Sequence, residues 1–121
     1  MDTHTLHYDA DTDCVVLRVE GRVTLDRIRT LAPEAASLCA EKECLRLLND
    51  MSTATIDISA LHVYESPKVM EESGITQWIK RALVIPPTFD EPDFLETVTR
   101  NRGHDFKTFT DVDKARKWLL T

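Results

Sequence analysis

Apolar residues alternate along the first part of this chain and recur at helical spacing farther on. Residues 14–20 carry apolar side chains at both odd and even positions, which predicts a strand that is covered at least partly on both faces. Residues 5–8 predict a shorter strand before it, and the short polar residues 9–13 suit a tight turn between the two. The first elements are therefore expected to form a β-hairpin.

The rest of the chain alternates between helical and strand patterns. Thr24 is the predicted N-cap of a helix, and Pro33 is expected to kink this helix or to divide it into a short turn and a main helix over about 33–43. A second helix is expected from about residues 57–59, with a break at Pro67. The remaining predicted elements are strands at 45–49, 81–85 and 106–110 and helices at 90–103 and 110–119. The predicted order is ββαβαβαβα, that of an α/β domain.

Length, charge and cysteine content narrow the class of protein. At 121 residues the chain fits a single domain, 1–121, that buries about two-thirds of its unfolded surface. The net charge of -6 repels the phosphate backbone of a nucleic acid, and the sequence has no basic patch large enough to overcome this repulsion. No nucleic-acid partner is therefore expected. Three cysteines and the absence of a signal peptide pattern indicate a reducing cytoplasm. The apolar runs are much shorter than the roughly twenty residues of a membrane span.

Four stretches of sequence, taken in order, resemble a known superfamily. Residues 15–21, 47–52, 81–86 and 109–119 are together similar to the STAS superfamily and its SpoIIAA-like branch, small domains named after bacterial anti-sigma-factor antagonists. The last stretch resembles an ending with phenylalanine, aspartate, alanine, tryptophan and leucine that is common in this branch. The resemblance covers nearly the whole chain. It implies a SpoIIAA-like fold, with a mixed five-stranded sheet and about four helices packed on one side.

The resemblance also implies a function. Members of this branch bind partners or ligands and do not catalyse reactions, and some are phosphorylation switches. In antagonist members the phosphoacceptor lies in an Asp-Ser-Ser-Gly-Leu motif at a helix start, and residues 57–61 are the nearest match, with Ile58 and Ala60 at two of its positions. Ser59 is then the candidate acceptor, where a phosphate would lie near a helix N-terminus. A serine that only caps the helix explains the same residue.

We therefore expect a cytoplasmic, non-catalytic regulatory module that binds a protein partner reversibly. The expected contact surface is the loop 50–59 with the helix after it. The candidate binding or switch residues in this region are Asp50, Ser52, Asp57, Ser59 and His62.

An alternative is a carrier of a lipid-like or other apolar small molecule. Another side of the SpoIIAA-like branch resembles the CRAL-TRIO lipid-carrier fold, which implies an apolar ligand between helices and sheet. The apolar residues that would line such a pocket are equally consistent with an ordinary hydrophobic core, or with a homodimer contact around the helix that contains Pro67. The candidate pocket residues are Leu61, Tyr64, Met70, Trp78 and Phe94.

The sequence does not predict a catalytic site or a metal site. Ser59 and His62 could meet on one helix face, but the flanking sequence has no nucleophile elbow and no glycine for close backbone approach. His4 and His7 lie in a predicted strand, on opposite faces, which argues against a shared metal. The sequence predicts neither enzyme activity nor a cofactor.

Overall fold

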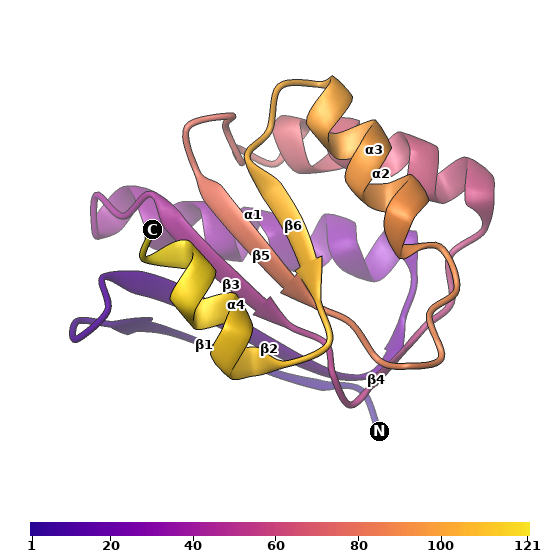
Figure 1. Cartoon of the computed structure of the whole chain (residues 1–121), viewed down its shortest axis with the longest axis horizontal. Helices are drawn as coiled ribbons and strands as arrows, with labels where there is room; N and C mark the ends of the chain where they lie inside the picture. Colours follow the sequence, from indigo (N-terminus) through magenta and orange to yellow (C-terminus); the bar gives the residue numbers. More distant parts are fainter.

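The structure, a computed structural model, describes residues 1–121 as one sheet with helices on both of its faces (Figure 1). In chain order the elements are β1 (Thr3–Asp9), β2 (Cys14–Val23), α1 (Leu25–Glu41), β3 (Arg46–Asp50), β4 (Ala54–Ile56), α2 (Ala60–Glu72), β5 (Lys80–Val84), α3 (Pro92–Asn101), β6 (Phe106–Phe109) and α4 (Val112–Leu119).

The sheet has the spatial order β1-β2-β3-β5-β6. β1 and β2 form the expected antiparallel hairpin, in which Asp9 pairs with Cys14 next to the turn. The pairs β2–β3, β3–β5 and β5–β6 are parallel. Parallel neighbours need a crossover connection, and α1, α2 and α3 provide one each.

The predicted α/β class and mixed sheet are confirmed, with one strand added. β2 runs three residues farther than predicted, and residues 21–23 of this extension pair with β4. β4 lies within the predicted loop 50–59. Its three residues form a strand because they find a partner about thirty positions earlier in the chain, which local sequence does not reveal.

The helices do not all pack on one side of the sheet. On one face, the core contains alternate strand residues such as Leu17, Leu47 and Leu83, covered by α1, α2 and α3. On the other face, a smaller core joins Leu48 and Val84 to α4. Figure 1 shows α4 alone in front of the sheet, with α1 behind it. The predicted arrangement is wrong in this detail, because an amphipathic pattern does not specify which sheet face a helix covers.

Neither internal proline breaks its helix. α1 begins after Thr24, whose side chain accepts a hydrogen bond from the backbone of the first turn as predicted, and continues through Pro33. α2 continues through Pro67, which removes the backbone donor for the carbonyl of Val63. The hydroxyl of Ser66 donates to that carbonyl at 2.8 Å. This hydrogen bond satisfies the carbonyl that Pro67 leaves without a backbone donor, and the predicted break is absent.

Candidate functional site

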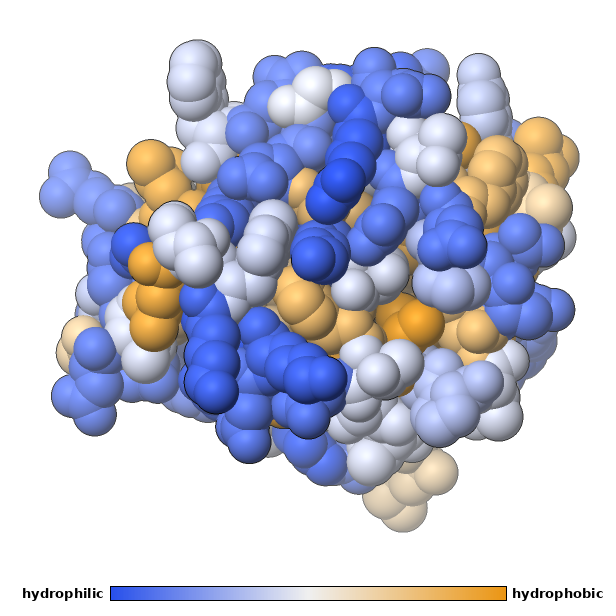
Figure 2. All heavy atoms as spheres, viewed as in Figure 1, coloured by the Kyte–Doolittle hydropathy of each residue, from blue (hydrophilic) through white to orange (hydrophobic).

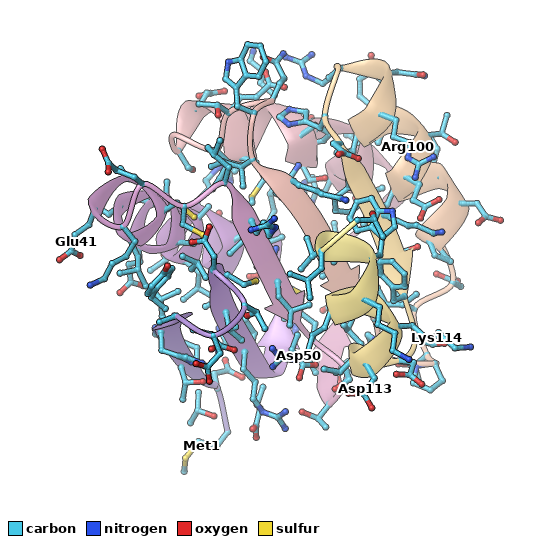
Figure 3. The ribbon with its side chains drawn as sticks, turned by 60° about the vertical axis from the view of Figure 1, so that its left-hand side comes forward. Met1, Glu41, Asp50, Arg100, Asp113 and Lys114 are labelled. Carbon is cyan, nitrogen blue, oxygen red and sulfur yellow. The ribbon has the colours of Figure 1, made fainter.

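Asp50 holds the loop after β3 in place. Its side chain is buried, and Oδ1 accepts hydrogen bonds from the backbone nitrogen of Ser52 at 3.0 Å and from its hydroxyl at 2.7 Å. Oδ2 accepts from Nη1 of Arg18 at 3.1 Å. Figure 3 shows Asp50 at the same end of the sheet as Asp113 in the first turn of α4. The hydrogen-bonding groups of Asp50 and Ser52 are thus used within the protein.

The segment before α2 is fixed by Asp57. Its backbone nitrogen donates to the carbonyl of Val23 at 2.8 Å, and its exposed carboxylate forms an ion pair with Arg22 of β2. Nε of Arg22 lies 2.6 Å from Oδ2 of Asp57. These contacts attach the start of α2 to the end of β2.

Ser59 is the N-cap of α2 and is exposed. Its hydroxyl oxygen accepts a hydrogen bond from the backbone nitrogen of His62 at 3.3 Å. The contact between these two residues therefore involves the backbone of His62 and is a capping interaction. Both side chains remain accessible at the amino-terminal end of the helix.

The outward face of α2 carries two large apolar side chains. Leu61 and Tyr64 are each 64% exposed and lie three residues apart, on neighbouring positions of one helix face. Figure 2 shows apolar atoms at the surface over the end of the molecule where α2 begins. Trp78, in the segment after α2, is 81% exposed. The prediction that these three side chains line an enclosed pocket is wrong.

A cavity of about 80 Å³ does lie between the sheet and helices α1, α2 and α3. Of the predicted pocket residues, Met70 lines this cavity. Phe94 does not line it; its side chain is half-buried and packs against the neighbouring core. Most of the cavity wall is apolar, but four polar residues also line it. These are Asn49, Ser66, Arg81 and Thr99, all buried.

Arg81 is a functional candidate in this cavity that was not predicted from the sequence. It is 3% exposed, and its Nε has no hydrogen-bond partner in the protein. Its guanidinium carbon lies 5.0 Å from the centre of the Phe106 ring. Burial lowers the pKa of Arg81 to about 10, although the charge of Glu71 opposes this effect. A signal was present in the sequence, since an arginine opens the otherwise apolar strand pattern of residues 81–85.

Glu71 is the nearby acid, and it is already paired. Its carboxylate accepts hydrogen bonds from Nε and Nη2 of Arg102 at 2.8 and 2.7 Å. Nε2 of the buried His104 lies 2.8 Å from Oε2. The hydrogen bonds from Arg102, assisted by His104, hold the pKa of Glu71 at about 2. Arg81 takes part in none of these ion pairs.

No helix of this structure combines the length and the apolar character that crossing a membrane requires.

Comparison with known proteins identifies the fold. No family model and no curated protein sequence matches the chain. Among solved structures, an uncharacterized protein of the DUF3478 family from Shewanella loihica, described as having a SpoIIAA-like fold, is 18% identical with a TM-score of 0.61; the match covers 98% of this chain and 93% of that one. An anti-sigma factor antagonist from Mycobacterium paratuberculosis is 14% identical with a TM-score of 0.65, over 100% and 96% of the two chains. The predicted resemblance is thus confirmed at the level of architecture: this chain has the SpoIIAA-like fold.

Proposed function

We propose that the chain is a non-catalytic module that binds a protein partner through the amino-terminal end of α2. We define this α2 surface by Asp57, Ser59, Leu61, His62 and Tyr64. The observation that supports the proposal is the exposure of Leu61 and Tyr64, side by side on the outward face of the helix. Exposed apolar side chains rimmed by polar residues are typical of protein contact sites, and tyrosine is enriched among residues that dominate binding energy.

The fold adds support of a more general kind. One protein with this fold is named as an anti-sigma factor antagonist, and by that name it acts on another protein. For this chain we propose reversible binding to a protein partner, with the α2 surface as the contact site.

Ser59 is the proposed regulatory position within the α2 surface. A phosphate on its hydroxyl would add between about one and a half and two negative charges, which the N-terminus of a helix tolerates. The same phosphate would lie close to the carboxylate of Asp57 and to the exposed side chains of Leu61 and Tyr64. Its charge would make it unfavourable to remove water from this surface when a partner binds. We therefore propose that phosphorylation of Ser59 leaves the fold intact and weakens partner binding.

Capture from an extract of the host tests the contact surface. The immobilised chain is compared with Leu61→Ser, Tyr64→Ser and the control Leu45→Ser, a similarly exposed leucine in the turn before β3. We expect one protein to be retained by the unmodified chain and by the control, and about tenfold weaker retention by each α2 variant. Equal retention by all four chains would contradict the proposed surface.

Two further variants test the switch with the same partner. Ser59→Ala should bind as the unmodified chain does, and Ser59→Glu should bind more weakly while keeping its circular dichroism spectrum. A second copy of this chain is an alternative occupant of the α2 surface, and light scattering identifies it. If the chain forms a dimer and Leu61→Ser dissociates it, the partner at the α2 surface is a second copy of this chain and not a different protein.

A further inference from the structure

The cavity between the sheet and helices α1 to α3 contains a charge that no side chain neutralises directly. Arg81 is buried, its Nε has no hydrogen-bond partner, and the nearby carboxylate of Glu71 is held by Arg102 and His104. Buried polar groups are almost always hydrogen-bonded, and a buried charge is normally paired. Arg81 therefore lacks the partner that its environment requires.

A second polar atom of the same wall is also unpartnered. Asn49 lies on β3 next to β5, where it pairs with Leu83, two residues beyond Arg81. Since alternate residues of a strand share one face, Asn49 and Arg81 both point toward the helices. Oδ1 of Asn49 is buried without a hydrogen-bond partner. Two independent polar groups on adjacent strands thus face one cavity.

We propose that this cavity binds a small organic acid, whose carboxylate pairs with Arg81 and whose hydrocarbon part packs against the apolar walls. The planar guanidinium matches a carboxylate through two parallel hydrogen bonds. The ring of Phe106 lies 5.0 Å from the guanidinium carbon and packs against that group. Oδ1 of Asn49 is an acceptor, so it is satisfied by a hydroxyl group of the acid or by a bound water.

The size and chemistry of the walls set the class of acid. The volume of about 80 Å³ is several times the roughly 10–15 Å³ that one water needs. The hydrocarbon part would contact Leu31 of α1, Val63 and Met70 of α2, and Leu95 of α3, all in the cavity wall. These dimensions fit an acid with a short aliphatic chain or one ring. The inference is independent of partner binding at the α2 surface.

Calorimetric titration and thermal melting with defined acids test the proposal. The probes are the straight-chain acids butanoate, hexanoate, octanoate and dodecanoate, with hexanamide as the uncharged match for hexanoate. We expect saturable binding of at least one acid and a rise of the melting temperature with it. The amide should bind at least about tenfold more weakly, because it lacks the negative charge and the second acceptor oxygen that pair with the guanidinium. If a short acid binds most tightly, the natural ligand is a free small metabolite. If dodecanoate binds most tightly, the natural ligand is a lipid-derived fatty acid.

Variants separate the charge from the shape of the site. Arg81→Met should bind hexanoate at least about tenfold more weakly, whereas Arg29→Met, an exposed arginine of α1, should bind it unchanged. Ala32→Leu fills the cavity from α1 and should block binding while Arg81 stays in place. Circular dichroism confirms that each variant is folded. Equal binding of acid and amide, unchanged binding by Arg81→Met, or no effect of any acid on the melting temperature would overturn the proposal.

Discussion

Replacing Arg81 by methionine is predicted to stabilise the unliganded protein. Burial lowers the pKa of the guanidinium from 12.5 to about 10, and both values lie far above 7. At pH 7 the group is therefore charged in the folded and the unfolded state. The lowered pKa then represents a penalty on the folded state that is constant at pH 7 and disappears progressively as the pH rises from about 10 to 12.5. A decrease of this size corresponds to about 3 kcal/mol.

Part of that gain is offset by lost contacts. The guanidinium of Arg81 lies over the ring of Phe106, an interaction that contributes about 1 kcal/mol. Methionine is unbranched and apolar, so it can occupy the path of the arginine stem without leaving a polar group unpaired. We expect a net gain of about 1–3 kcal/mol in the free energy of unfolding, in line with other replacements of buried charges by apolar residues. The melting temperature should rise by about 3–15 °C.

Urea unfolding and thermal melting at pH 7 measure this effect directly. Arg29→Met is the matched control, because its guanidinium is half-exposed and pairs only with Asp26 on the surface of α1. Its effect should stay within about 0.5 kcal/mol. A loss of more than about 1 kcal/mol in Arg81→Met would refute the reasoning, since it would mean that the folded protein already compensates this charge.

Three further predictions concern the ion pair of Glu71, two buried cysteines and the hydroxyl of Ser66. Because Arg102 holds the pKa of Glu71 at about 2, below its ordinary 4.5, the carboxylate stabilises the folded state above about pH 4.5 and this contribution disappears as the pH falls toward 2. Glu71→Gln should cost about 1 kcal/mol at pH 7, reduced by solvent screening of the pair, and much less at pH 2.5; equal losses in urea unfolding at the two values would contradict this. Burial raises the pKa of Cys14 to about 11 and of Cys39 to about 12, so both should react with a disulfide reagent only after unfolding, and rapid reaction of the native protein would contradict the burial. Ser66→Ala removes the hydroxyl donor beside the proline of α2 and should lower the free energy of unfolding by about 1–2 kcal/mol, whereas an unchanged urea midpoint would show that this hydrogen bond is dispensable.

The parts of the fold that depend on local pattern were predictable. The apolar strands and the N-cap at Thr24 follow from residues that are close in sequence. The short strand β4 and the position of α4 do not, because each depends on a partner far away in the chain. α1 and α2 both continue through a proline, and in α2 the hydroxyl of Ser66 donates to the carbonyl that Pro67 leaves without a backbone donor, which a rule about proline cannot anticipate.

The candidate site was predictable to a smaller degree. Leu61 and Tyr64 were predicted to line an apolar pocket, but the face of α2 that packs on the core contains Val63 and Val69 instead. Helical spacing cannot distinguish a buried stripe from an exposed apolar patch on the same short helix. Arg81 was overlooked because one charge at a strand start usually reaches solvent, whereas here α2 and α3 cover it.

Site-specific photocrosslinking in the host tests the protein-binding account most directly. A photoreactive amino acid replaces Leu61 on the α2 surface in one version of the chain, and replaces Leu45 in the control version. We predict that irradiation attaches one protein to position 61 and not to position 45, and that Ser59→Glu reduces the yield. Equal labelling from both positions, or no adduct from position 61, would contradict the claim that the α2 surface binds a protein partner.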